Sequence, residues 1–321
     1  MNNLLPWLYP GSIPLMLAPM QGLTNRGLRD LFGEWVRPDV MFTEFIRVRP
    51  GSRKVFSRVD HLEAASVGHN IPLVVQIIGK DSEALVAAAR AAQEKGAFHL
   101  NLNLGCPYGR MNMGSAGGAL LKHPEGLEDR LRYLRENIKG SFSVKIRSGY
   151  DDPEQIFGLL PVFEDCGVDF IVLHPRTVIQ KYEGIADHNL TARVVAATNI
   201  PVIANGDVTT AAEGKDVLAK TGAAGLMIGR GAIRDPLLFK RLRGEAQQGL
   251  TRDERSAELC YYITQLTMRY RRIFSGDVQV LNKMKAILSM LRDDEFFAGE
   301  IRKILRTKNL DRFLSLSKKL Y

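Results

Sequence analysis

The sequence predicts an α/β protein: a (β/α)8 TIM barrel followed by a small all-helical C-terminal domain. Eight short apolar runs recur along the first 230 residues, separated by helix-like stretches such as 82–95 and 125–137. Apolar runs of this length are typical of parallel strands that are buried on both faces. After residue 251 the strand pattern stops, and apolar residues recur three and four positions apart, as they do in amphipathic helices.

The eight predicted strands are Leu15–Ala18, Val40–Thr43, Leu73–Ile78, Phe98–Leu104, Ser143–Ile146, Phe170–Leu173, Val202–Ala204 and Gly225–Ile228. Eight βα units in this length of chain fit a closed barrel better than the alternative, an open doubly wound sheet. A charged helix is expected over 237–248, and helices over 257–273, 280–292 and 299–306. The predicted domains are therefore residues 1–248 and 249–321.

Composition narrows the class of protein. The chain has 321 residues, of which 45% are hydrophobic and 25% charged, so it is long enough for a real core. Its three widely spaced cysteines argue against a disulfide framework and against a metal site. The N-terminus lacks the pattern of a signal peptide, and no apolar run approaches a membrane span. We expect a cytoplasmic protein without a membrane partner, and a monomer.

Positive charge is concentrated at the end of the chain. The formal net charge is +9, and residues 251–321 hold 15 Lys and Arg against 9 Asp and Glu. A solvated helical face would explain such a charge distribution, and so would an anionic partner such as a nucleic acid.

Polar and small residues follow every predicted strand. In a parallel barrel the chemistry lies at the C-terminal ends of the strands, so these residues should converge on one mouth. They include Pro19, Met20, Gln21, Glu44, Gln76, Asn103, Cys106, Lys145, Arg147, His174, Asn205, Gly206, Asp207, Gly229 and Arg230. We expect one of Lys145 and Arg147 to face the barrel interior, unless Lys145 only pairs with Glu44 or Asp207.

Two features of these strand ends carry chemistry. Cys106 stands between Gly105 and Pro107, so we expect its thiol to be accessible to a ligand rather than buried in the core. The alternative is a cysteine without a functional role. The glycines around Asp207 and Arg230 follow the last two strands, where barrels commonly bind phosphate. Tight loops alone would also explain those glycines, and a phosphate would not separate a cofactor from a phosphorylated substrate.

Together these motifs resemble the tRNA-dihydrouridine synthases over about residues 15–235. The matching stretches are 18–20 (APM), 43–45 (TEF), 75–77 (VQI), 103–107 (NLGCP) with 117–121 (GGALL), 144–149 (VKIRSG), 174–177 (HPRT), 182–187 (YEGIAD), 201–207 (PVIANGD) and 227–231 (MIGRG). The set is specific, although each piece alone is not. Where the family usually has a Trp, this chain has His188.

The resemblance implies an FMN enzyme that uses NADPH, or NADH, to reduce the C5=C6 bond of a tRNA uridine. Hydride would pass from the reduced flavin to C6, and Cys106 would protonate C5; a free thiol is mostly protonated at neutral pH and can donate. The resemblance places FMN against Pro19, Met20, Gln21, Gln76, Lys145 and His174, with its phosphate at Asn205, Gly206, Asp207, Gly229 and Arg230. It places the uracil at Asn103, Arg147 and Tyr182, and tRNA on the C-terminal helices.

The stretch 43–48 (TEFIRV) followed by 54–56 (KVF) most resembles bacterial C-type members, which act on the D-loop uridine at position 16. Two other functions stay open. One is a dihydroorotate-dehydrogenase-like FMN oxidoreductase acting on a free pyrimidine, which would not need a basic tail. The other is an RNA-binding protein without catalysis, which would not need Cys106, Lys145 and His174.

Overall fold

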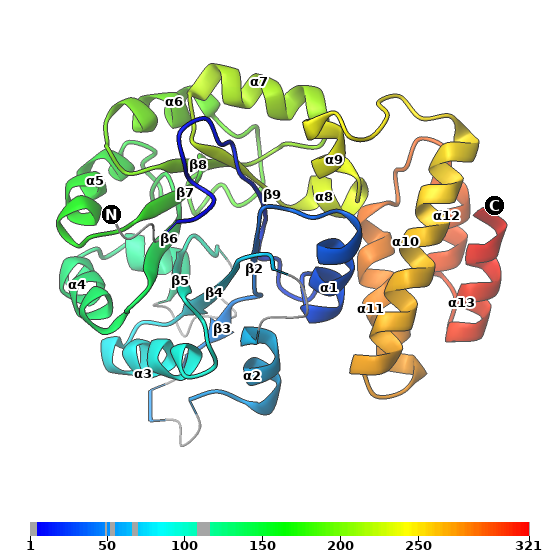
Figure 1. The fold of residues 1–321 in the computed structure, drawn as a ribbon, viewed down its shortest axis with the longest axis horizontal. Coiled ribbons are helices and arrows are strands. Elements are labelled where there is room, and N and C mark those ends of the chain that lie inside the picture. Colours follow the sequence, from blue (N-terminus) through cyan, green and yellow to red (C-terminus); the bar gives the residue numbers. More distant parts are fainter. Residues whose placement is uncertain (1–4, 49, 52–54, 66–69, 108–115, 321) are drawn as a thin grey trace.

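The computed structural model describes residues 5–48, 50–51, 55–65, 70–107 and 116–320. Its centre is a parallel barrel (Figure 1). The strands are β1 (Leu15–Leu17), β2 (Val40–Phe42), β3 (Ile46–Arg47), β4 (Leu73–Ile78), β5 (His99–Leu104), β6 (Ser141–Arg147), β7 (Phe170–His174), β8 (Val202–Asn205) and β9 (Gly225–Ile228). Pairing of β1 with β9 and of β2 with β4 closes a ring of eight.

The closed ring confirms the predicted barrel, and each of the eight apolar runs overlaps a strand of the ring. The short strand β3 was not predicted. It pairs with β4 outside the ring, with Ile46 opposite Ile77, so it extends the sheet without widening the barrel.

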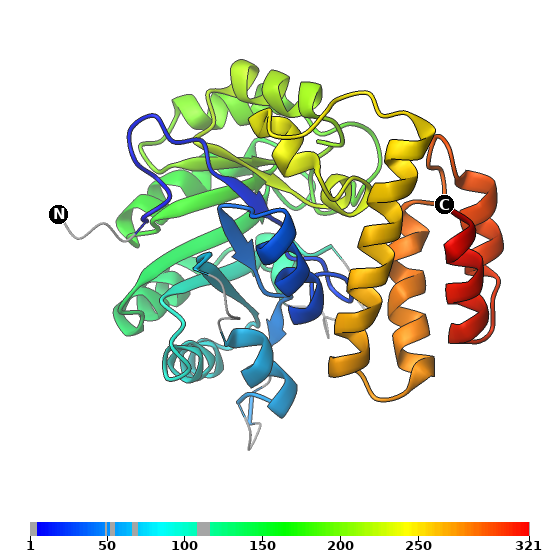
Figure 2. The same ribbon diagram turned by 45° about the vertical axis from the view of Figure 1, so that its right-hand side comes forward.

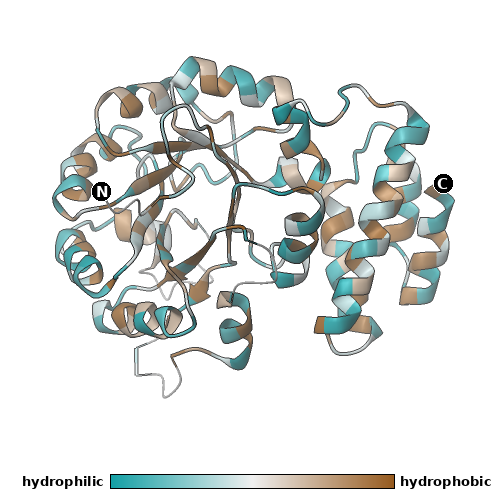
Figure 3. Ribbon diagram, viewed as in Figure 1, coloured by the Kyte–Doolittle hydropathy of each residue, from teal (hydrophilic) through white to brown (hydrophobic). Residues whose placement is uncertain are grey.

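Helices cover the outside of the barrel (Figures 1 and 3). They are α1 (Arg26–Trp35), α2 (Arg58–Ala64), α3 (Ser82–Gln93), α4 (Leu127–Asn137), α5 (Gln155–Asp165), α6 (His188–Ala196), α7 (Ala211–Thr221), α8 (Arg230–Arg234) and α9 (Leu238–Arg243), with a 3-10 turn at Gly117–Leu121. The helix predicted over 237–248 is shorter than expected, because Gly244 adopts φ 77° and ends α9.

Four helices follow the barrel: α10 (Arg252–Ile273), α11 (Asp277–Met290), α12 (Ala298–Leu305) and α13 (Leu310–Ser317), then a 3-10 turn at Lys318–Leu320. Helices α10 and α11 stand beside α1 and α8, and α12 and α13 lie on the side away from the barrel (Figure 2). Helix α10 starts five residues earlier than predicted, because Thr251 and Glu254 form a capping box. Helix α13 was not predicted; Asn309 caps it and Phe313 is fully buried.

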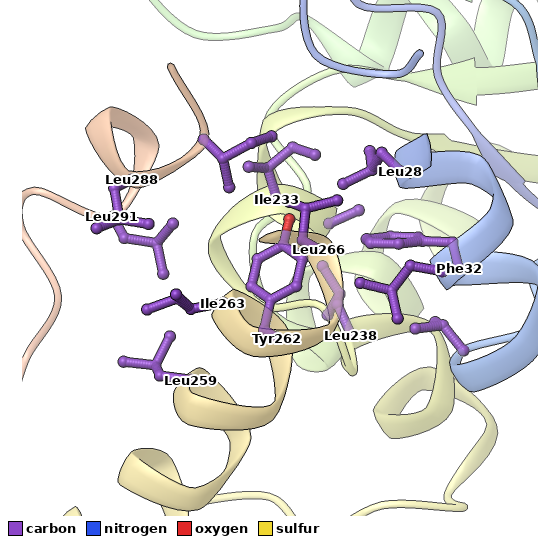
Figure 4. Close-up of a cluster of buried hydrophobic side chains, with 14 of the residues drawn as sticks. Leu28, Phe32, Ile233, Leu238, Leu259, Tyr262, Ile263, Leu266, Leu288 and Leu291 are labelled. Carbon is purple, nitrogen blue, oxygen red and sulfur yellow. The ribbon is translucent and has the colours of Figure 1, made fainter. Parts of the chain in front are cut away.

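One hydrophobic cluster joins these helices to the barrel. Figure 4 shows Leu28 and Phe32 of α1 close to Tyr262 and Leu266 of α10. The rings of Phe32 and Tyr262 lie 6.3 Å apart, centroid to centroid. A boundary at residues 248 and 249 stays a prediction, but the core itself is continuous across it.

The barrel interior is filled from its N-terminal end. Trp7 packs edge-on against His99, 4.5 Å away, and against Phe170 in a cluster with Met16 and Met227. This cluster fills the N-terminal part of the barrel interior. None of the helices that the structure describes is both long and apolar enough to cross a membrane.

We expect Leu266→Ala to lower the free energy of unfolding by about 2–5 kcal/mol, because it empties a fully buried position in the shared cluster. Urea unfolding followed by circular dichroism measures the change. Met268→Ala on the same helix is the control; that side chain is 49% exposed, and its loss should change stability by less than about 0.5 kcal/mol. Equal small changes in both variants would contradict a shared core.

Candidate functional site

A cavity of about 730 Å³ lies at the C-terminal ends of the strands, within the size range of small-molecule sites. Almost all of the predicted site residues line it: Pro19, Met20, Gln21, Asn103, Cys106, Lys145, Arg147, His174, Tyr182, Asn205, Gly206, Asp207, Gly229 and Arg230. They come from strand ends far apart in the sequence. Barrel closure therefore brings them together, as the strand-end argument predicts.

Gln76, which the resemblance placed against FMN, does not line the cavity. It is fully buried in β4, where its Nε2 donates to Asn101 Oδ1 at 2.8 Å. Its Oε1 accepts from Asn103 Nδ2 at 2.9 Å. Both ends of the Gln76 amide are therefore hydrogen-bonded inside the barrel. The bond to its Oε1 holds the Asn103 side chain in place.

Asn103 in turn holds the backbone that carries Cys106. Its Oδ1 accepts from the backbone N–H of Gly105 at 3.1 Å and of Cys106 at 2.9 Å. Arg147 Nε donates to the Gly105 carbonyl at 2.9 Å from the neighbouring strand. These three hydrogen bonds fix the turn after β5, so the half-buried Cys106 faces the cavity.

Lys145 and Arg147 both line the cavity. The expectation that only one of them faces inward is wrong, because residues two apart on a strand lie on the same face. Lys145 Nζ donates to Asn205 Oδ1 at 2.7 Å, and neither Glu44 nor Asp207 pairs with it among the described residues. Burial, with help from the Arg147 guanidinium, lowers the pKa of Lys145 to about 7.

His174 is a neutral imidazole in this surrounding. Burial lowers its pKa far below the ordinary value, and the neighbouring cations Lys145 and Arg147 lower it further. Arg176 Nη1 lies 3.2 Å from His174 Nε2, and a guanidinium can only donate. Nε2 is therefore the acceptor, and the ring proton is on Nδ1.

An ion pair that the sequence did not reveal organises the same end of the barrel. The buried Arg176 donates to Asp207 Oδ1 at 3.0 Å and to Oδ2 at 2.6 Å. Burial alone would raise the pKa of Asp207, but the hydrogen bonds from Arg176 and from the Ala186 N–H outweigh it and hold that pKa below its ordinary value. Asp207 is therefore a carboxylate at neutral pH.

Tyr182 and Arg230 form the outer wall of the cavity. The Tyr182 ring contacts two guanidiniums, with its centroid 5.0 Å from Arg230 Cζ and 5.3 Å from Arg147 Cζ. Arg230 also lies 3.5 Å from Asp207 Oδ1, and its side chain is half exposed. The half-exposed Arg230 guanidinium is therefore a cation at the cavity that a ligand can reach.

Comparisons with known proteins place the chain in a family. The model of the dihydrouridine synthase (Dus) family matches residues 16–313, which is most of the chain. The chain belongs to the dihydrouridine synthase family. It is therefore an oxidoreductase, and the resemblance seen in the sequence is confirmed at the level of the family.

Three relatives are similar to this chain in sequence, and one solved structure is similar in fold. The tRNA-dihydrouridine synthase B of Vibrio cholerae is 33% identical over 241 residues, 75% of this chain and 74% of that protein. The tRNA-dihydrouridine(16) synthases of Haemophilus influenzae and Cupriavidus necator are both 35% identical, over 73% and 72% of this chain and 78% and 73% of theirs. Morphinone reductase shares the fold, with a TM-score of 0.56 at 12% identity over 74% of this chain and 87% of that one.

In this dihydrouridine synthase family member, sequence reasoning also missed a wall of the cavity. Met290 at the end of α11 and Arg234 at the end of α8 line it. Arg234 Nε donates to the Met290 carbonyl at 3.1 Å. Residue 290 lies in a predicted helix and residue 234 in no predicted element, and no sequence pattern shows that the C-terminal helices reach the mouth.

Glu44, which the sequence placed among the strand ends, does not line the cavity. Its Oε2 accepts from the Gly22 N–H at 2.8 Å, and burial raises its pKa although that bond and Lys283 oppose the shift. Lys283 of α11 donates to the Gly22 carbonyl at 3.3 Å.

The described residues contain no cluster of His, Cys, Asp and Glu that could hold a metal ion.

We expect Asp207→Asn to cost about 3 kcal/mol of stability at pH 7, because Arg176 would be buried without its counter-charge. The pKa of Asp207 lies below 3.8, so its contribution is present above that value and is lost as pH falls through the lowered pKa. The difference between wild type and variant in urea unfolding should therefore shrink below about pH 4. Asp216→Asn, at an exposed position on α7, should show neither effect.

Proposed function

We propose that the protein is a flavin-dependent tRNA-dihydrouridine synthase that reduces the C5=C6 bond of a D-loop uridine, with NADPH, or NADH, as reductant. One observation carries the proposal: in a dihydrouridine synthase family member, a held cysteine, a buried lysine and a neutral histidine line a single cavity at the barrel mouth. When bound, FMN would supply the hydride. The chain's own residues would bind FMN and the uridine, orient the two, and protonate the uracil.

The residues at the mouth fit an FMN phosphate. A Cβ on Gly206 would lie 2.8 Å from His174 Cδ2 and 2.9 Å from Ala186 Cβ. A side chain at this position would therefore clash with both residues, and only glycine fits. The N–H of Asp207 has no acceptor among the described residues. A free N–H beside the Arg230 guanidinium suits a phosphate. We assign Asn205, Gly206, Asp207, Gly229 and Arg230 to it.

The rest of the cavity fits a flat ring that carries hydrogen-bond acceptors. Pro19, Met20 and Met227 supply apolar wall, while Lys145 supplies a cation whose charge responds to the ligand. His174 has its proton on Nδ1 and can donate a hydrogen bond to a ring oxygen. In this proposal Pro19, Met20, Gln21, Lys145 and His174 contact the ring, and Gln76 acts on it through Asn103.

Cys106 is the proposed proton donor to C5 of the uracil. Its thiol is held at the cavity by the turn that Asn103 and Arg147 fix. Asn103, Arg147 and Tyr182 line the same part of the cavity and are the proposed uracil contacts. A uridine in folded tRNA must be extruded to reach this pocket, which costs a few kcal/mol that pocket contacts must offset.

The proposals of a tRNA substrate and of the reacting position rest on the charge of the C-terminal helices and on the names of relatives. Residues 251–321 carry the excess of Lys and Arg, and α11 of that region lines the cavity through Met290. The names of two relatives at 35% identity specify position 16. We propose position 16, as in the C-type resemblance, while a relative at 33% identity is a B-type synthase.

The direct test uses purified protein and tRNA that lacks dihydrouridine. We expect a bound flavin spectrum and NADPH-dependent formation of dihydrouridine at position 16, mapped by sequencing. Protein that stays colourless after FMN is added would refute a flavin enzyme. Equal reduction of free uracil would favour the alternative of a free-pyrimidine oxidoreductase, and tRNA binding without reduction would favour the non-catalytic alternative.

We expect Cys106→Ala to keep its bound flavin and its rate of flavin reduction by NADPH, but to lose about 100-fold or more in dihydrouridine formation, because general acid catalysis contributes that much. Single-turnover assays with prereduced enzyme measure the loss. Cys166→Ala, at a buried cysteine beside α5, is the control and should react normally. A near-normal rate in Cys106→Ala would remove Cys106 from the acid role.

We expect FMN affinity to fall as pH rises above 7, by up to about tenfold per pH unit. The pKa of Lys145 is about 7 without ligand, and a phosphate-bearing ligand that accepts a hydrogen bond from the ammonium favours the protonated amine, so binding above pH 7 must take up a proton. Fluorescence titration from pH 6 to 9 measures this slope. Lys145→Met should flatten it, whereas Lys215→Met, at an exposed site on α7, should keep it.

A further inference from the structure

His188, the first residue of α6, is buried and does not line the cavity. Its Nε2 lies 3.1 Å from the carbonyl oxygen of Gly206, in the loop after β8. Its Nδ1 lies 3.3 Å from Thr191 Oγ1, one turn along the same helix. His188 thus connects the start of α6 to the loop that borders the cavity.

The protonation of His188 follows from its partners. A carbonyl oxygen can only accept, so Nε2 must carry a proton. Burial lowers the pKa of His188 although the bond to Gly206 opposes the shift, so the ring is neutral at pH 7. Nδ1 is then an acceptor for the Thr191 hydroxyl, and this bond fixes the ring orientation.

Holding the Gly206 carbonyl also orients the next N–H. The peptide between Gly206 and Asp207 is trans, so its N–H points opposite to its C=O. The carbonyl faces His188, which lies outside the cavity lining, whereas Gly206 and Asp207 belong to that lining. The Asp207 N–H is the group that has no acceptor among the described residues.

This peptide needs a partner to keep its orientation. Gly206 has φ 133° and Asp207 has φ 50°, and a positive φ is uncommon for a residue with a side chain. The Arg176 and Ala186 bonds hold the Asp207 carboxylate, but they do not touch the peptide itself. His188 is the side chain that does.

We propose that His188 is a positioning residue: through the Gly206 carbonyl it keeps the Asp207 N–H directed at a bound anion, which is the 5′-phosphate of FMN if the proposed function holds. It touches neither flavin nor uridine. Its effect should therefore be confined to ligands that carry the phosphate. Riboflavin, which has the same ring system without phosphate, is the matching probe.

The test compares two substitutions of nearly equal volume. His188→Gln retains an N–H donor near the position of Nε2, whereas His188→Met has none. Apoprotein is titrated with FMN and with riboflavin, and flavin fluorescence reports each affinity. We expect His188→Met to weaken FMN about tenfold, as for the loss of a hydrogen bond to a charged group, and to change riboflavin less than about twofold. His188→Gln should recover most of the FMN affinity.

Two further variants separate positioning from stability. Thr191→Val removes only the hydroxyl that fixes the ring and should weaken FMN selectively, by about threefold, so it tests the idea even if His188→Met does not fold. His99→Leu alters another buried histidine, at the start of β5 and the far end of the barrel, and should leave the ratio of FMN to riboflavin affinity unchanged.

The outcomes distinguish the two proposals. Equal losses of FMN and riboflavin affinity in His188→Met, or no recovery in His188→Gln, would overturn the role of His188 while the flavin site stands. Wild-type protein that binds FMN no better than riboflavin would do the same. Wild-type protein that binds neither flavin would overturn the proposed cofactor and the positioning role with it.

Discussion

The mouth of the barrel depends on the ion pair between Arg176 and Asp207. Besides its two bonds to Asp207, the Arg176 guanidinium donates to the carbonyls of Glu183 at 3.1 Å and Gly184 at 2.6 Å. The ends of β7 and β8 and the loop that carries Tyr182 are therefore attached to one buried cation. A buried pair of this kind gives little net stability compared with an apolar contact. Its value is that it fixes where the cavity walls stand.

The same cation shapes the electrostatics of the cavity. Lys145, Arg147, Arg176 and Arg230 all act on His174, while Asp207 is the acidic partner at their centre. An excess of positive charge favours anions at this mouth and keeps His174 uncharged. Burial and the Arg147 guanidinium lower the pKa of Lys145 to about 7, so this amine is only partly protonated near neutral pH.

The sequence predicted the parts of the site that depend on chain order. Cys106, His174 and Arg230 each follow an apolar run, and parallel strands bring their carboxyl ends together whatever the helices do. It could not show that Gln76 points into the barrel core rather than the cavity, because β4 is buried on both faces and carries no alternation. Met290 could not be found either, since its place depends on how α10 packs on α1 and how α11 packs on α10 and α8. Arg176 stood in a recognised stretch, but its partner lies 31 residues away.

The continuous core between the barrel and the last four helices limits how this chain can change. Leu28 and Phe32 of α1 are as much a part of the surface under α10 as of the barrel wall. Asn25, which caps α1, bonds the Tyr270 hydroxyl, and a Cβ on Gly27 would lie 2.8 Å from Ile273 Cδ1. A chimaera that exchanges the C-terminal helices for those of a relative would have to bring a compatible α1 with them. In this protein, a change in the helix that begins the Lys- and Arg-rich region therefore constrains the first helix of the barrel.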